Sequence, residues 1–291
     1  MFSRKLSGSL YFFLLMFLSV NILNAKDPIK ALIVTGQNNH NWRVSSVVLQ
    51  KYLNESGIFA ADMVISPEKD KDMPSFCPDF SAYSVIVLDY NGDSWSEDTN
   101  SAFLEYVKNG GGVVVYHAAD NAFRNWKEYN EIIGLGGWEN RDETDGPYVY
   151  FSNGKEVRDT SPGPGGNHGD QHEYKIMLRV KDHPITKGLP DVWTHSVDEL
   201  YDRLRGPAKN MTILATAYSD KNTRGTGRDE PILMVLNWGK GRIFHTVLGH
   251  VGGPVHPAID GHSFIVTFLR GTEWAATGEV TQKVPDDFPK K

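Results

Sequence analysis

Two patterns of apolar residues take turns along the first half of the chain: short continuous runs, and longer segments with helical spacing. Short apolar runs at residues 29–35, 85–89 and 110–116, and the start of another at 63–66, are typical of strands buried on both faces of a sheet. Between these runs, and directly after the last of them, apolar residues recur at helical spacing over 10–15 residues and predict helices. Strands that alternate with helices predict a parallel sheet built from right-handed β-α-β units.

The second half of the chain has a different pattern. Residues 160–169 are rich in proline and glycine and predict a long loop, a kind of segment that is often functional in compact domains. Residues 211–218 predict a strand, and residues 232–238 and 242–248 predict a hairpin around a glycine-rich turn. An amphipathic helix is expected at 261–276. The whole pattern favours an α/β fold with a mostly parallel sheet and an additional hairpin in the C-terminal half.

The N-terminal segment is not expected to belong to the fold. Basic residues precede an apolar run at residues 10–23, and Ala25 provides the small residue of a cleavage site. The run is short for a transmembrane helix, although a retained membrane anchor is the alternative interpretation. We therefore predict a signal peptide at residues 1–25 and a single mature domain at 26–291. The mature protein is expected to be exported to the periplasm or the cell exterior and not to bind a membrane.

Composition and charge exclude several classes of protein. The net charge of −6 and the lack of a basic block argue against nucleic acid as a partner. A single cysteine, Cys77, permits no internal disulfide, and no glycine-rich phosphate-binding motif is present, so no nucleotide cofactor is expected. Seven tryptophans and twelve tyrosines are compatible with a small carbohydrate as the partner, because aromatic rings stack on the apolar faces of sugars.

Histidines follow several of the predicted strands. His117 directly follows the strand at 110–116, and His40 and Trp42 lie in the polar loop after the first strand. His250 follows the second strand of the predicted hairpin. Ligands of open α/β sheets bind outside the carboxyl ends of the strands, so these are expected functional positions. A hydrogen-bonded core histidine is the alternative interpretation of His117.

An H-x-D-x-H pattern, formed by His168, Asp170 and His172, ends the loop that is rich in proline and glycine. On a strand the three side chains would point to one side, because side chains alternate with a period of two. The same side continues through apolar residues that form the expected inward face: Tyr174, Ile176, Leu178 and Val180. Such a set is chemically able to hold a metal ion, and a solvated loop edge is the alternative.

Residues 193–201 combine imidazole, carboxylate and phenol side chains within a short span. His195, Asp198, Glu199 and Tyr201 supply the mixture that general acid–base catalysis and sugar binding both use. The alternative is that Asp198 and Glu199 are surface charges.

Several of these stretches together resemble the ThuA-like (trehalose utilisation) family. The resemblance covers nearly all of residues 29–290, and its motifs are specific in combination although none is decisive alone. The matching stretches are residues 34–36, 40–43, 115–121, 182–185, 198–201, 248–250 and 270–278. The resemblance implies a flavodoxin-like three-layer α/β/α sandwich, similar to that of class I glutamine amidotransferases.

The resemblance also limits the chemistry. Amidotransferases of this fold use a cysteine nucleophile at a strand-to-helix turn, and His117 stands at the position that looks equivalent. Thiolate acyl transfer is therefore not expected. Members of the family are associated with disaccharides and 3-keto sugars. Where the family pattern leads us to expect an aspartate after His250, this chain has Val251, so His256 or His262 is expected to supply the polar group.

These observations favour an exported carbohydrate-utilisation enzyme that acts on a disaccharide or 3-keto-glycoside by hydrolysis or proton transfer. A ketone acidifies neighbouring C–H groups, so a base and an electrophilic stabiliser suffice for such a step. The expected catalytic residues are His117, Glu199, Tyr201 and His250. Glu199 is expected to be the acid–base group and Tyr201 the hydrogen-bond donor. The expected substrate-binding residues are His40, Trp42, Asp120, His195 and His256. A divalent metal is a further hypothesis, held by some of His117, His172, Glu199 and His250.

Two other functions fit the sequence. The same aromatic and carboxylate side chains would serve a non-catalytic exported sugar-binding protein or partner subunit. A two-carboxylate glycoside hydrolase needs an opposed pair of carboxyl groups roughly 5–10 Å apart. For that pair the sequence offers Glu199 with either Asp120 or Asp170.

Overall fold

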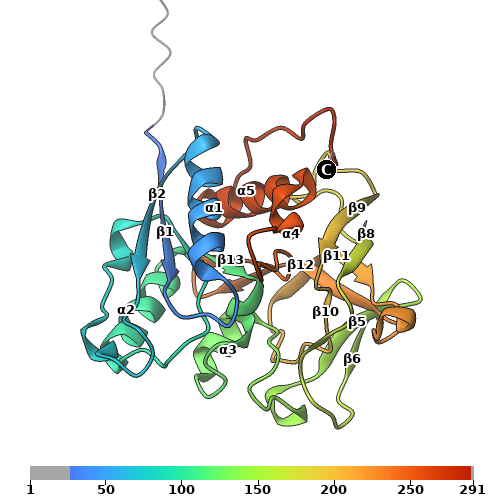
Figure 1. Cartoon of the computed structure of the whole chain (residues 1–291), viewed down its shortest axis with the longest axis horizontal. Coiled ribbons are helices and arrows are strands. Elements are labelled where there is room, and N and C mark those ends of the chain that lie inside the picture. The colour runs from blue at the N-terminus through green and yellow to red at the C-terminus, as the bar shows by residue number, and fades with distance from the viewer. Residues whose placement is uncertain (1–26, 290–291) are drawn as a thin grey trace, which may run out of the picture.

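The structure, a computed structural model, describes residues 27–289 and is built on a mixed sheet of eleven strands (Figure 1). Five neighbouring strands run parallel in the order β2-β1-β3-β4-β13. They are β1 (Ile29–Thr35), β2 (Phe59–Ile65), β3 (Val85–Leu88), β4 (Gly112–Tyr116) and β13 (Gly241–Thr246). This is the flavodoxin-like strand order, so the predicted α/β fold is confirmed. The predicted signal peptide at 1–25 lies outside the described residues.

The remaining strands extend the sheet beyond β13 in antiparallel pairs, in the order β13-β12-β11-β8-β9, with β5 and β6 branching from β12. They are β5 (Tyr148–Ser152), β6 (Lys155–Asp159), β8 (His172–Leu178), β9 (Val192–Asp198), β11 (Met211–Tyr218) and β12 (Asp229–Trp238). A separate pair joins β7 (Asn167–His168) to β10 (Tyr201–Asp202). The predicted hairpin corresponds to β12 and β13, and the strand predicted at 211–218 coincides with β11.

Helices cover both faces of the parallel half, which makes the three-layer sandwich (Figure 1). The helices α1 and α5 contact each other and lie on one face, whereas α2 and α3 lie on the other. The α-helices are α1 (Trp42–Glu55), α2 (Glu97–Lys108), α3 (Lys127–Ile133), α4 (Pro257–Asp260) and α5 (His262–Thr277). Short 3₁₀ turns are η1 (Met73–Ser75), η2 (Phe80–Ala82), η3 (His117–Asn121), η4 (Glu143–Asp145) and η5 (Lys221–Thr223). Among the described residues, we find no helix with the length and apolar character needed to cross a bilayer.

Three local predictions differ from the structure. The second strand begins at Phe59 rather than near residue 63, because its N-terminal half alternates between buried and exposed residues and has no continuous apolar run. After β4 the chain forms the 3₁₀ turn η3, and the α-helix starts only at Lys127. The H-x-D-x-H pattern is not one strand, since β7 ends at His168 and β8 begins at His172. Within β8 the expected alternation holds, with Tyr174, Ile176 and Leu178 buried.

The fold brings the carboxyl ends of several strands to one edge of the sheet. The parallel strands β1, β3, β4 and β13 all end there, and β9 points the same way because it is separated from β13 by three intervening antiparallel strands. The chain passes from β1 to β2 on one side and then to β3 on the other, so strand order reverses between β1 and β3. A crevice at such a reversal is where ligands of open α/β sheets bind.

Candidate functional site

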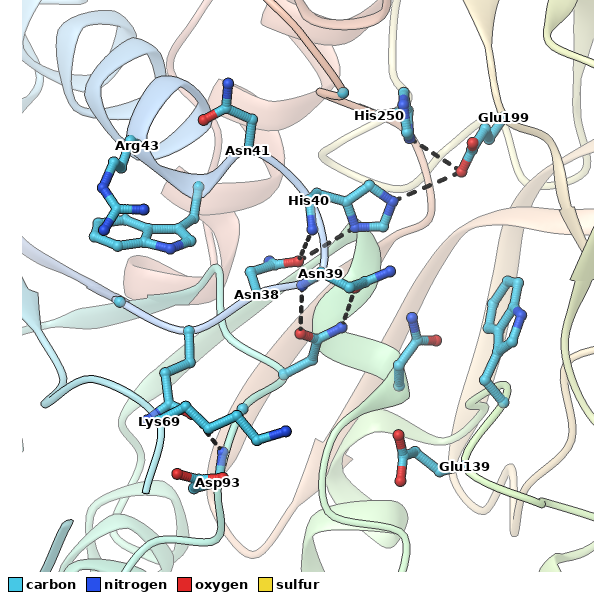
Figure 2. A pocket seen from close by; sticks show the side chains of 18 of the residues that line it. Asn38, Asn39, His40, Asn41, Arg43, Lys69, Asp93, Glu139, Glu199 and His250 are labelled. Carbon is cyan, nitrogen blue, oxygen red and sulfur yellow. Dashed lines mark hydrogen bonds and ion pairs between the residues drawn. The ribbon is translucent and has the colours of Figure 1, made fainter. Parts of the chain in front are cut away.

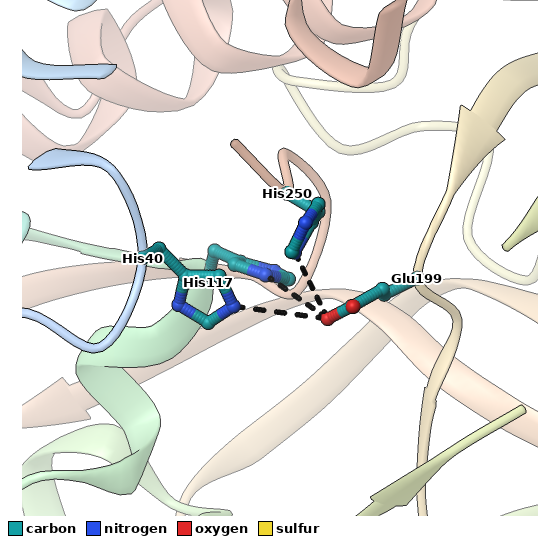
Figure 3. Close-up of side chains that lie close together, drawn as sticks. All are labelled: His40, His117, Glu199 and His250. Carbon is teal, nitrogen blue, oxygen red and sulfur yellow. Dashed lines mark ion pairs between the residues drawn. The ribbon is translucent and has the colours of Figure 1, made fainter. Parts of the chain in front are cut away.

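Four side chains from four different loops meet at this edge of the sheet (Figure 3). His40 follows β1, His117 follows β4, Glu199 follows β9 and His250 lies beyond β13. One nitrogen of each histidine and one oxygen of the glutamate all lie within 4.8 Å of one another. From Glu199 Oε2, the distances are 3.0 Å to His250 Nδ1, 3.7 Å to His40 Nε2 and 3.9 Å to His117 Nε2. We call these four residues the His–Glu cluster.

Hydrogen bonds fix which imidazole nitrogens point into the cluster with a lone pair. His117 Nδ1 lies 2.7 Å from the carbonyl oxygen of Val247, which can only accept, so Nδ1 carries the proton and Nε2 the lone pair. His40 Nδ1 lies 3.2 Å from Asn38 Oδ1. The orientation of that amide is set by its Nδ2, which donates to Asp89 at 2.9 Å. His40 therefore also presents Nε2 as a lone-pair nitrogen.

The electrostatics of the cluster favour a neutral imidazole beside an ionised carboxylate. Burial and the neighbouring His40 lower the pKa of His117 to about 3, so His117 is neutral at ordinary pH. Burial by itself raises the pKa of Glu199, but the imidazoles of His250 and His40 outweigh it and hold that pKa well below its usual range. His250 Nδ1 is close enough to bond to the carboxylate, whereas the lone-pair nitrogens of His40 and His117 lie 3.7 Å and 3.9 Å from it and gain little from it. The same donor set is suited to a divalent cation.

The backbone at His117 is itself unusual. Its φ angle is 44°, in the left-handed region that non-glycine residues rarely adopt. The turn from β4 into η3 imposes this angle, and Nε2 of the buried ring has no hydrogen-bond partner among the described residues. Such strained positions gather at functional sites, and here the strain directs the imidazole into the cluster.

One buried carboxylate supports two of the loops. Asp198 Oδ1 accepts the backbone N–H of Glu199 at 2.7 Å and of His250 at 3.0 Å, while Oδ2 accepts that of Gly249 at 2.8 Å. His195 Nε2 lies 2.9 Å from the same Oδ2. Asp198 and Glu199 are only 1% and 7% exposed, so their interpretation as surface charges is wrong.

A polar pocket of about 1010 Å³ opens in front of the cluster (Figure 2). Predicted residues on its wall are His40, Trp42, Glu199, Tyr201 and His250. His117 lies behind this wall, with its ring stacked on that of Tyr201 at a centroid distance of 4.3 Å. Burial raises the pKa of Tyr201 well above its usual value, so its phenol remains a hydrogen-bond donor.

Other predicted residues lie away from the pocket wall. Asp120 is fully buried and faces His245, with Oδ2 3.4 Å from Nε2, so it is not placed to bind a sugar. His195 is buried between Asp198 and Ser263 and acts through Asp198.

Two further histidines are also outside the cluster. His172 Nδ1 lies 2.6 Å from the backbone carbonyl of Asp170, and the cluster contains His40 in its place. His256 faces Asp260 at 3.0 Å and does not line the pocket, nor does His262. The position after His250 is taken by Val251, which is buried.

Sequence reasoning missed several pocket residues in the loops after β1 and β3. Asn39 and Asn91 hydrogen-bond across the point where strand order reverses, at 2.5 Å between Asn91 Nδ2 and Asn39 Oδ1. Trp138, which lies against Tyr201 at a centroid distance of 4.6 Å, and Glu139 also line the pocket. So does His168, which the sequence had indicated as part of the H-x-D-x-H pattern. The signal for Asn91 was its place directly after an apolar strand, whereas no periodic pattern marks Trp138 or Glu139.

Comparison with known proteins agrees with this architecture. The family model described as trehalose utilisation matches residues 30–275. A crystal structure of a ThuA-like protein from Parabacteroides merdae is 61% identical, covers 91% of this chain and 95% of its own, and superposes with a TM-score of 0.89. A ThuA-like protein from Bacteroides uniformis is 20% identical over 88% of this chain and 94% of its own, with a TM-score of 0.59, and supports the fold alone. Comparison with curated proteins gives no match.

Proposed function

The chain belongs to the ThuA family, which is described as a family of trehalose utilisation. We propose that it is a carbohydrate-processing enzyme with a divalent metal ion at the His–Glu cluster. Its proposed substrate is a small sugar such as a disaccharide or a 3-keto-glycoside, converted by hydrolysis or proton transfer. The family supports the carbohydrate-related role, and the site supports the chemistry.

The observation that carries the proposal is the convergence of His40, His117, His250 and Glu199, in which two of the three imidazoles present a lone-pair nitrogen to the centre. Two imidazole nitrogens are fixed as lone-pair donors, and their neighbour is an ionised carboxylate. Three histidines and one carboxylate suit zinc and other first-row divalent metals. Such an ion, when bound, supplies a Lewis acid for a carbonyl or hydroxyl oxygen of a sugar.

The remaining pocket residues can bind the sugar and move protons. Tyr201 donates a hydrogen bond from a phenol that stays protonated. His168 Nδ1 lies 2.9 Å from the carbonyl of Gly169, so Nε2 is its lone-pair nitrogen, 3.8 Å from Glu199 Oε1. We assign His168 as the base, because Glu199 is one of the four residues proposed to hold the metal ion. A candidate base is judged first by its position relative to the reacting proton and only then by its pKa.

A two-carboxylate glycosidase mechanism that pairs Glu199 with Asp120 or Asp170 has no support. Asp120 is buried against His245, and Asp170 is paired with Arg224 at 2.5 Å. Neither residue lines the pocket that contains Glu199.

The test is metal analysis of the purified protein, with a chelator-treated control, alongside turnover of trehalose and 3-keto-trehalose. Stoichiometric metal with chelator-sensitive turnover is the expected result. Turnover without bound metal would overturn the metal assignment. Binding of sugar without product, measured by titration calorimetry, would favour the alternative of a non-catalytic sugar-binding protein. A protein that shows no turnover and binds no sugar would overturn the carbohydrate role.

We also propose that the protein is exported by a signal peptide at residues 1–25. The basic residues, the apolar run at 10–23 and Ala25 support this proposal. N-terminal sequencing of the protein secreted by its own cells is expected to begin at Lys26. A mature protein that retains Met1 would contradict it.

A further inference from the structure

A second pocket opens beside the first. Its volume is about 570 Å³, and it is continuous with the first because the same four residues line both: Asn91, Gly92, Asn121 and Glu139. None of the four residues of the His–Glu cluster lines the second pocket. The two pockets therefore form one elongated cavity with the cluster at one end.

The wall of the second pocket is rich in side-chain amides. Five asparagines line it: Asn91, Asn100, Asn121, Asn125 and Asn140. Each amide offers two N–H donors and one acceptor oxygen, which suits the paired hydroxyls of a sugar ring. The half-buried aromatic side chains of Phe123 and Trp126 line the same wall and offer surfaces for the apolar face of a ring. The one arginine of this wall, Arg124, is already bound to Asp145, at 2.9 Å. This composition fits a neutral, hydroxyl-rich ligand.

Two of these amides have acceptor oxygens that no described residue satisfies. The oxygen Oδ1 of Asn121 is buried in a residue that is only 6% exposed, and Oδ1 of Asn100 is also buried. Buried acceptors in folded proteins are nearly always paired, because an unpaired one costs free energy. Both residues line the second pocket, so an amide that turns toward a ligand there would pair its oxygen with a hydroxyl donor.

The junction between the two pockets is held rigidly. Trp138, Glu139 and Asn140 have consecutive positive φ angles of 54°, 47° and 60°. The guanidinium of the buried Arg141 holds this turn by donating to the carbonyl oxygens of Gly137 at 2.7 Å and, on the neighbouring segment, Asn121 at 3.0 Å. This strained turn places Glu139 on the wall of both pockets.

We propose that the second pocket binds the distal units of an oligosaccharide whose first units occupy the pocket at the His–Glu cluster. The inference rests on the proposed carbohydrate function and extends it to the length of the substrate. The first pocket alone reaches the upper end of small-ligand sites, which is roughly 1,000 Å³. The continuous cavity therefore accommodates a chain longer than a disaccharide.

The test measures binding as a function of chain length. The metal-loaded protein is screened on an array of linear oligosaccharides of one to six units in several linkages, and the best series is titrated by calorimetry. Affinity is expected to rise with length beyond two units. The variants Ser94→Ala and Asn125→Ala change exposed side chains that line the second pocket and not the first. Each is expected to lose about fivefold in affinity for the longer chains, as for one neutral hydrogen bond, and nothing for the shortest.

Asn237→Ala is the matched control, because Asn237 is an exposed asparagine on β12 that lines neither pocket. It is expected to bind every chain like the wild type. Affinity that does not depend on length, or an equal loss for all lengths in the two variants, would overturn the inference and leave the proposed function intact. A wild type that binds metal but no sugar on the array would overturn the carbohydrate function, and the inference with it. Metal content, measured for each variant, reports that the cluster is still assembled.

Discussion

The carboxylate of Asp198 accepts the backbone N–H of His250 at 3.0 Å, although the two residues are 52 positions apart in the chain. Through the same oxygen it accepts the N–H of Glu199 at 2.7 Å. Burial by itself raises the pKa of Asp198, but the bond and charge of His195 hold it below its usual value, so the group stays ionised. One buried anion thus sets the relative positions of two members of the His–Glu cluster.

Replacing this anion is expected to weaken metal binding. In Asp198→Asn, the amide keeps only one acceptor oxygen for three backbone N–H groups and His195. Changes in residues that orient the metal ligands without binding the metal typically cost about 10–100-fold in metal affinity, and we expect a loss in that range. Titration with Zn²⁺ measures it. Asp202→Asn is the control, since Asp202 is equally buried but bonds to Asn167 and Ser219 instead. An unchanged Zn²⁺ affinity in Asp198→Asn would refute this role.

The structure places His40 in the cluster, whereas the set predicted from the sequence contained His172. Two variants decide between them. His40→Ala removes a lone-pair nitrogen from the cluster, so we expect Zn²⁺ affinity to fall by more than about 100-fold, beyond the range for supporting residues. His172→Ala is expected to bind Zn²⁺ like the wild type, because His172 lies outside the group. Zn²⁺ titration of both proteins is the measurement. The reverse result would restore the set predicted from the sequence.

Stability is expected to fall as pH rises through the pKa of Asp89. Burial raises the pKa of this carboxyl to about 7, and the bonds from Ser45 and Asn38 only partly offset that effect. The folded state then holds the proton more tightly than the unfolded state. The stabilisation is complete below about pH 4 and is lost towards pH 7, on the order of 4 kcal/mol.

Asp89→Asn removes this titration and keeps both neighbours bonded, because an amide can accept from Asn38 and donate to Ser45. Urea unfolding between pH 4 and pH 8 should therefore show a flatter dependence than in the wild type. Glu230→Gln is a companion variant, since burial also raises the pKa of Glu230 to about 7. An Asp89→Asn profile that parallels the wild type would count against the raised pKa.

The helix α5 packs so closely on β13 that adding one methyl group at their contact is expected to destabilise the fold. A Cβ at Gly271 would lie 2.1 Å from the ring of Phe244. Overpacking costs about 1–3 kcal/mol, which exceeds the roughly 1 kcal/mol that alanine gains over glycine in a helix. Gly271→Ala should therefore lower the free energy of unfolding in urea. At Gly253 a Cβ meets nothing within 4 Å, so Gly253→Ala is expected to be neutral. Equal stability of the two variants would mean that the helix can shift without cost.

Much of the fold was predictable because burial repeats with a fixed period in regular elements. The strand predicted at 29–35 coincides with β1, and the helix predicted at 261–276 differs from α5 by one residue at each end. The prediction failed where burial is not periodic. The edge strand β2 alternates only in part, and residues 168–172 belong to two short strands and the turn between them.

The sequence by itself predicted the alternating strands and helices of the parallel half, the hairpin and the last helix, and it indicated that polar groups follow the strands at His40, His117 and His250. Only the tertiary structure decided that these histidines converge on Glu199, that His172 does not join them, and that Asp120 is buried. The reason is physical. Side chains in loops follow no period, and their directions are set by hydrogen bonds between distant segments, such as those from His250 and Glu199 to Asp198.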